Sequence, residues 1–230
     1  MRKISVIICA LNEEKTISNV IKHVSKYPIV GQIVVVNDGS TDSTKEIIDK
    51  LKDELGITAI HLSQNMGKGY AMAVGVENAF FDTIVFTDAD QRIISDYINH
   101  LLSPLLMNEY DMVLGYTTVN ILNMDINPLK ILTGERAMHK EDLVPILGKM
   151  KKSRFGVETL LYFHYLSLGK ALKFIHLKDL KHNDKYKKMP YRKATVSYIN
   201  EAWEITYTAM KHNDLILKTL KYKIKKIISI

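Results

Sequence analysis

The sequence lacks the features that mark secreted and membrane-spanning proteins. Its single cysteine, Cys9, excludes a disulfide bond within the chain. Cys9 lies in the apolar run ISVIICA, where its simplest role is that of a small residue buried in the core. This run is too short for a signal peptide, and no other segment approaches the roughly 18 uninterrupted apolar residues of a membrane span. We therefore expect a cytoplasmic protein.

Several motifs are also absent, and their absence narrows the classes of nucleotide-binding protein. The chain has no G-x-x-x-x-G-K-[ST] phosphate-binding loop, and no G-x-G-x-x-G follows the first apolar run. Kinase-like and dinucleotide-binding proteins are therefore disfavoured. The basic stretches lack the clustered aromatic residues of a nucleic-acid site, so we expect no nucleic-acid partner. Internal repeats and Gly/Ser linkers are absent too, which favours a single domain with an appendage.

The composition is that of a globular protein with a local basic surface. The chain has 230 residues, 47% of them apolar, and a net charge of +7. Lys and Arg are concentrated in residues 178–193 and in the tail after Leu217. Such a surface suits phosphate groups or anionic lipid, and charge alone does not choose between them.

Strand and helix patterns alternate along the chain. The predicted strands are residues 3–11, 31–42, 57–64, 82–90, 110–119 and 171–182. The predicted helices are residues 12–27, 42–55 with Thr41 or Asp42 as its cap, 66–80, 95–108 and 155–169. Residues 120–147 read as a loop followed by a helix. The alternation predicts an α/β fold with a doubly wound, mostly parallel sheet and a ligand site at the carboxyl ends of its strands.

Polar clusters fall at those strand ends. Asp88 and Asp90 follow an apolar strand and suit a divalent cation bound through oxygen, which would clamp a diphosphate; the alternative is that they cap the next helix. The carboxylate of Asp38 could accept hydrogen bonds from the donor groups of a nucleotide. The alternative is an Asx turn, which uses the same residue types. Lys68, between two glycines, is placed for a phosphate at a helix start.

Taken together, ALNEE, NDGSTDST, NMGKGYA and DAD resemble the nucleotide-sugar-binding half of glycosyltransferases with the GT-A fold, above all family 2. The resemblance covers Ile4 to Val119 and implies a Rossmann-like sheet flanked by helices. It implies that Asp90 binds Mg2+ or Mn2+ and that Asp88 reaches the metal or the ribose. The nucleotide-sugar site that it implies consists of Ala10, Leu11, Glu13, Asp38, Lys68, Asp88 and Ala89, to which the second half of the chain adds Thr133 and Gly134.

The second half, with LTGERAMHKEDL, RFGVETLL and LKHNDK, resembles the glucosyl-3-phosphoglycerate synthases, the retaining GT-A family 81. The resemblance implies that Thr133, Gly134 and Glu135 border the sugar and acceptor, that Glu158 faces them, and that His182 completes the metal site. Catalysis would involve Glu135, Glu158 and Asp90. From the residues alone, Glu158 could instead pair with a lysine, and His182 could be a solvated loop residue.

These observations predict transfer of a hexose from a nucleotide-diphosphate sugar to a phosphorylated acceptor such as 3-phosphoglycerate, and the resemblance implies that the donor is a UDP-sugar and the hexose glucose. A GDP-sugar is the alternative donor, and the basic segment around Lys185 would neutralise the acceptor phosphate. Three alternatives remain open: a polyprenyl-phosphate glycosyltransferase at the membrane surface, a catalytically silent nucleotide-sugar-binding protein, and a phosphohydrolase of the haloacid dehalogenase type.

The predicted domains are a GT-A catalytic domain, 1–190, divided into a nucleotide-sugar half, 1–119, and an acceptor half, 120–190, and a helical appendage, 191–230. Within the appendage, residues 215–230 would form a basic, partly amphipathic helix. Such a helix permits peripheral contact with the inner membrane surface and a lipid-phosphate acceptor; the alternative is packing on the core or on a second subunit of a homodimer.

Overall fold

The central feature of the computed structural model is a seven-stranded sheet with the strand order β10-β6-β9-β4-β1-β2-β3. The structure describes residues 2–92, 96–117, 119–121, 124–126, 130–177, 181–182, 214–215 and 217–219. The sheet strands are β1 (Ile4–Ala10), β2 (Val30–Asn37), β3 (Thr58–His61), β4 (Thr83–Asp88), β6 (Met112–Tyr116), β9 (Arg136–His139) and β10 (Leu172–His176). All neighbours pair in parallel except β9, which is antiparallel to β4 and β6. The predicted α/β fold with a mostly parallel sheet is confirmed.

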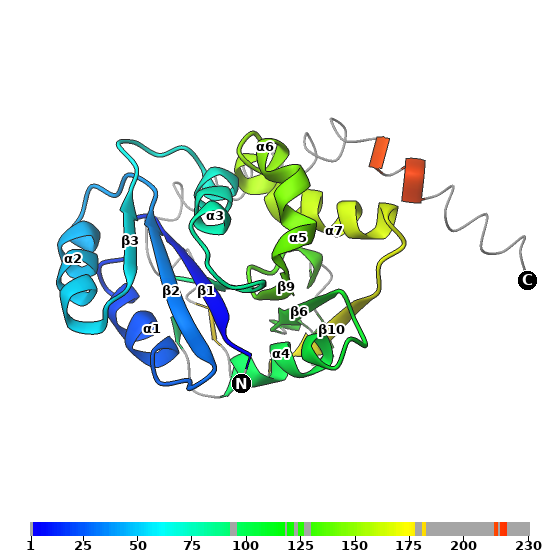
Figure 1. The fold of residues 1–230 in the computed structure, drawn as a ribbon, viewed down its shortest axis with the longest axis horizontal. Coiled ribbons are helices and arrows are strands. Elements are labelled where there is room, and N and C mark those ends of the chain that lie inside the picture. The colour runs from blue at the N-terminus through cyan, green and yellow to red at the C-terminus, as the bar shows by residue number, and fades with distance from the viewer. Residues whose placement is uncertain are drawn as a thin grey trace, which may run out of the picture.

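Helices cover both faces of this sheet (Figure 1). One face packs against α1 (Ile17–Val24), α2 (Thr44–Leu55) and α4 (Tyr97–Leu106). The other packs against α3 (Lys68–Glu77), α6 (Leu147–Met150) and α7 (Val157–Ser167). Successive strand residues point to opposite faces, so Val6 and Ile8 enter the first core cluster while Ile7 enters the second. The central strands are therefore buried on both sides, as their continuous β-branched runs predict.

Shorter elements connect these layers. They are β5 (Gln91–Arg92), β7 (Val119–Ile121), β8 (Met124–Ile126), β11 (Lys181–His182), α5 (Lys140–Leu143), and the 3-10 turns η1 (Lys130–Leu132), η2 (Val144–Ile146) and η3 (Arg154–Gly156). β5 pairs with β11, and β7 pairs with β8, both antiparallel. Because β5 follows Asp90 and α4 begins only at Tyr97, after Asp96, the two aspartates do not cap a following helix.

The prediction of a loop and a helix over residues 120–147 is wrong for β9. The segment GERAMHKEDL is rich in helix-favouring residues, and only four of its residues form the strand. The β conformation comes from the neighbours β4 and β6, which lie far away in the sequence and pair with both edges of β9. The helix that was expected here starts later, at Lys140.

The expected cap of α2 needs correction, and most of the expected C-terminal appendage lies outside the described residues. Ser43, not Thr41 or Asp42, is the N-cap residue of α2, although Asp42 Oδ1 accepts a hydrogen bond from the Thr44 amide at 3.0 Å. The appendage of residues 191–230 is described only at 214–215 and 217–219, which are helical. Within the described part of the chain, no helix is long and apolar enough to span a membrane.

Candidate active site

The predicted polar clusters meet at one edge of the sheet. β1 runs parallel to both β2 and β4, with Ala10 paired to Asn37 and Cys9 paired to Asp88. The carboxyl ends of these three strands therefore lie side by side, and the loops that follow them share one site. Cys9, near the carboxyl end of β1, is partly buried and packs against the second core cluster.

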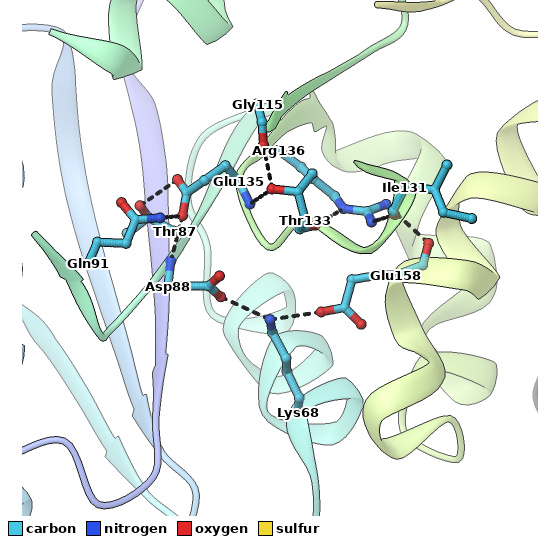
Figure 2. A network of polar contacts seen from close by, with 10 residues as sticks. All are labelled: Lys68, Thr87, Asp88, Gln91, Gly115, Ile131, Thr133, Glu135, Arg136 and Glu158. Carbon is cyan, nitrogen blue, oxygen red and sulfur yellow. Dashed lines mark hydrogen bonds and ion pairs between the residues drawn. The ribbon is translucent and has the colours of Figure 1, made fainter. Parts of the chain in front are cut away.

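The centre of the site is a lysine held between two carboxylates (Figure 2). Lys68 Nζ lies 2.9 Å from Asp88 Oδ1 and 2.7 Å from Glu158 Oε1. Glu158 is only 7% exposed, whereas Lys68 and Asp88 retain about a quarter of their exposure. Burial would lower the pKa of Lys68, but the carboxylates of Asp88 and Glu158 raise it well above its usual value. Lys68 is therefore a fixed positive charge, and the predicted pairing of Glu158 with a lysine describes its actual contact.

Glu135 supports the end of β4 from inside the protein. The residue is fully buried, and its carboxylate accepts hydrogen bonds from Thr87 Oγ1 at 2.8 Å and from the Asp88 amide at 2.9 Å (Figure 2). Gln91 Nε2 donates to the same carboxylate. Since both oxygens are occupied by protein donors, Glu135 braces the turn that carries Asp88 and Asp90.

Gly134 and Thr133 form a tight loop against that turn. A Cβ atom at Gly134 would overlap both carboxylate oxygens of Asp88, so only glycine allows this approach. Thr133 Oγ1 donates to the carbonyl of Gly115 at the end of β6. The loop is therefore fastened to β6 on one side and packed against Asp88 on the other.

Asp38 organises the loop before α3. Its two carboxylate oxygens accept hydrogen bonds from the amides of Met66, at 2.7 Å, and Gly67, at 2.9 Å. Burial raises the pKa of Asp38, while these amides oppose the shift. Gly67 has a positive φ of 94°, which suits glycine at this turn. The Oδ1 atom of Asn37 accepts a hydrogen bond from the Ser40 amide at 2.9 Å, three residues on, and so stabilises the loop after β2.

The remaining nucleotide-site candidates line the same edge. Ala10 is buried, and its carbonyl accepts a hydrogen bond from the Asp38 amide at 2.9 Å. Leu11 is half-buried, and the Glu13 amide donates to Thr44 Oγ1 at 2.8 Å. Ala89 is buried between the two aspartates. The structure thus brings the ALNEE, NDGSTD and DAD segments together.

The metal candidates are brought together by the backbone. β11 pairs with β5 so that His182 lies opposite Gln91, the residue after Asp90. Among the side chains that the structure describes, no group of three His, Cys, Asp or Glu is arranged for a metal ion. The predicted set needs His182, whose side chain lies outside the described part. Carboxylate and imidazole ligands nonetheless suit Mn2+ and tolerate Mg2+, so the donor chemistry of Asp88, Asp90 and His182 fits such an ion.

Two residues at this edge were not predicted. Gln91 joins β5 to Glu135, and Arg136 binds backbone carbonyls of the 131–133 segment and of α7 (Figure 2). The available signal was an arginine at the start of the four-residue strand RAMH, which became recognisable only when β9 was placed in the sheet.

Comparison with known proteins agrees with this geometry. The sequence model of glycosyl transferase family 2 matches residues 5–165. Poly-beta-1,6-N-acetyl-D-glucosamine synthase of Staphylococcus aureus is 30% identical over 119 residues, which are 51% of this chain and 28% of that protein. The chain thus spans little more than a quarter of the length of that relative. An uncharacterised protein of Methanocaldococcus jannaschii is 28% identical over 203 residues, covering 77% of this chain and 82% of that protein.

Solved structures with the same fold include glucosyl-3-phosphoglycerate synthase of Mycobacterium tuberculosis. Its complex with Mn2+, UDP and glucosyl-3-phosphoglycerate has a TM-score of 0.68 and 23% identity, and the match covers 91% of this chain and 79% of that chain. Its complex with Mn2+, UDP-glucose and glycerol 3-phosphate has a TM-score of 0.68 and 24% identity, with the same coverage. The predicted GT-A fold is confirmed, and because the family match spans more than half of the chain, this protein belongs to glycosyl transferase family 2.

Proposed function

We propose that this protein is a metal-dependent glycosyltransferase that moves glucose from UDP-glucose to a small phosphorylated acceptor such as 3-phosphoglycerate. The observation that carries the proposal is the placement of Lys68, Asp88 and Glu158 at the carboxyl ends of the strands, beside the Asp38 loop. The donor and acceptor follow from the synthase of similar fold, which was solved with UDP-glucose and phosphoglyceric acid. A GDP-sugar is the alternative donor.

The metal would be held by Asp90 and His182, with Asp88 beside them. Once bound, it would neutralise charge that develops on the leaving diphosphate. Lys68 contributes a second positive charge, already ionised and oriented by its two carboxylates. Preoriented charges of this kind stabilise a transition state without further rearrangement of the site.

The two candidate catalytic glutamates, Glu135 and Glu158, hold other residues of the site in place. Glu135 is fully buried with both oxygens bound, and Glu158 pairs with Lys68. A general base must reach the acceptor hydroxyl, whereas Glu135 has both oxygens bound inside the protein and Glu158 shares its Oε1 atom with Lys68. This supports a retaining reaction, in which an oxygen of the leaving diphosphate takes the acceptor proton on the same face of the sugar.

Isothermal titration calorimetry of the protein with UDP-glucose, UDP-N-acetylglucosamine, GDP-mannose and GDP-glucose, each with Mn2+ and with chelator, tests the donor. We expect UDP-glucose to bind only with metal. Transfer assays with 3-phosphoglycerate, glycerol 3-phosphate and a polyprenyl phosphate then identify the acceptor. Binding without any transfer would favour a silent nucleotide-sugar-binding protein, transfer to the polyprenyl phosphate alone would replace the acceptor, and no donor binding would refute the proposal.

A further inference from the structure

Arg136, the first residue of β9, is a fully buried cation that binds main-chain carbonyls. Its Nη2 donates to Ile131 O at 2.6 Å, its Nε to Thr133 O at 2.9 Å, and its Nη1 to Glu158 O at 3.2 Å. Ile131 belongs to η1, Thr133 to the loop before Glu135, and Glu158 to the first turn of α7. One planar side chain therefore joins three segments of the acceptor half.

Burying a guanidinium group is costly unless its donors are satisfied and its charge is compensated. The rigid fork of arginine can bind several carbonyls at once, whereas a lysine ammonium is a single point charge on a flexible stem. Burial lowers the pKa of Arg136 to about 10, and the nearby carboxylates of Glu158 and Asp88 oppose that shift. Arg136 thus stays charged at neutral pH, beside the two carboxylates that hold Lys68.

Arg136 and the residue before it, Glu135, act on opposite sides of the site. Figure 2 shows Glu135 pointing toward Thr87, Asp88 and Gln91, whereas Arg136 points toward the 131–133 segment and α7. Glu135 fixes the turn that carries Asp88, and Arg136 fixes the helix that carries Glu158. The start of β9 thereby sets the separation of the two carboxylates that share Lys68.

We propose that Arg136 is a positioning residue for glycosyl transfer: its guanidinium holds the first turn of α7, and so keeps Glu158 on Lys68, while it holds the Thr133 carbonyl beside Gly134. The catalytic consequence of this role rests on the proposed function. The anchoring of α7 by Arg136 does not depend on any substrate.

Three variants test this role. Arg136→Gln removes both the positive charge and the planar guanidinium group, and Arg136→Lys keeps the charge without the planar group. The matched control is Lys140→Met. Lys140 follows the other end of β9, away from the site, and its Nζ atom donates to the Ala79 carbonyl at 2.6 Å. Each variant is assayed for transfer from UDP-glucose with Mn2+, for UDP binding, and for amide hydrogen exchange in α7, at a temperature where circular dichroism shows it folded.

We expect Arg136→Gln to lower kcat about 100-fold, because small displacements of a positioned group have effects of that size. Arg136→Lys should recover part of kcat, UDP binding should be unchanged in both, and exchange of the amides of residues 159–163 should accelerate. Lys140→Met should leave kcat and α7 exchange as in the wild type. A folded Arg136→Gln variant with wild-type kcat, or loss of UDP binding in parallel with kcat, would overturn the positioning role. If the wild type itself binds no nucleotide sugar, the proposed function fails, and unchanged α7 exchange in Arg136→Gln would still overturn the anchoring.

Discussion

Lys68 on α3 and Glu158 on α7 form an ion pair whose Nζ and Oε1 atoms are 2.7 Å apart, with the glutamate almost entirely removed from solvent. The pair joins a helix of residues 1–119, the predicted nucleotide-sugar half, to a helix of residues 120–190, the predicted acceptor half. Asp88 contacts the same ammonium group, so the strand end that carries the metal candidates is tied to both helices. One lysine thereby couples the two halves of the site.

Removal of Lys68 should destabilise the protein markedly. In Lys68→Met, the buried Glu158 loses its counter-ion while Asp88 remains nearby, and breaking a buried pair in this way costs about 3 kcal/mol of unfolding free energy. Urea denaturation measures the loss. Glu77→Gln is the matched control, because Glu77 pairs with Lys151 at the surface, where such pairs contribute about 0.5 kcal/mol. Equal losses in the two variants would show that the Lys68 pair behaves as a surface contact.

Gly134→Ala should weaken binding of the metal and donor. The new Cβ would collide with the Asp88 carboxylate, which is held by Lys68 and therefore has little freedom to move away. Gly148→Ala is the control, because nothing lies within 4 Å of a Cβ at Gly148. We expect Mn2+-dependent UDP binding, measured by calorimetry, to weaken in Gly134→Ala and to stay unchanged in Gly148→Ala. Wild-type affinity in Gly134→Ala would mean that Asp88 shifts without consequence.

Most of the nucleotide-sugar half was predictable from the sequence. Its strands are β-branched runs with a helix between each pair, and each polar cluster follows directly after a strand, so local patterns locate Asp38, Lys68 and Asp88. Parallel pairing then brings these residues together without further information. Pairing of Glu158 with a lysine was expected only as one alternative, and Lys68 was not identified as the partner, because the contact joins helices that are far apart in the sequence.

The acceptor half was less predictable for a physical reason. β9 has only four residues, and its strand conformation is imposed by β4 and β6 from both sides, so no local period marks it. The roles of Glu135 and Arg136 depend on that strand. The resemblance implies that Glu135 borders the sugar, which stays a prediction. The structure adds that its carboxylate is buried and supports the end of β4, and burial of this kind cannot be predicted from neighbouring residues.

His164 on α7 should make stability depend on pH. Burial lowers the pKa of His164 below 6.5, opposed by Asp142 and reinforced by Lys149 and Lys170. Since the unfolded chain binds the proton more tightly, the contribution is fully present above pH 6.5 and is lost as the pH falls toward the lower pKa of the folded state. We expect His164→Asn, which cannot titrate, to reduce the loss of unfolding free energy between pH 7.5 and pH 5.5. His100→Asn, at an exposed position on α4, should keep the wild-type slope. Parallel curves for all three proteins would contradict this assignment.

The last prediction concerns the metal ligands. Asp90 ends the turn that Glu135 braces, and the pairing of β5 with β11 carries His182 to Gln91, so both residues belong to one small region of backbone. If both bind the metal, Asp90→Ala and His182→Ala should each weaken Mn2+-dependent binding of UDP by more than the roughly 10- to 100-fold that loss of an outer partner costs.

Folding should be intact in both variants, because both residues are polar and the two core clusters consist of hydrophobic side chains. Asp53→Asn on α2 and His100→Ala on α4 are matched controls at exposed positions. Calorimetry with and without chelator separates the metal-dependent part of UDP binding from the rest. If His182→Ala keeps full metal dependence while Asp90→Ala loses it, the ion is held by the aspartates alone, and the β5–β11 pairing serves to close the site rather than to ligate the metal.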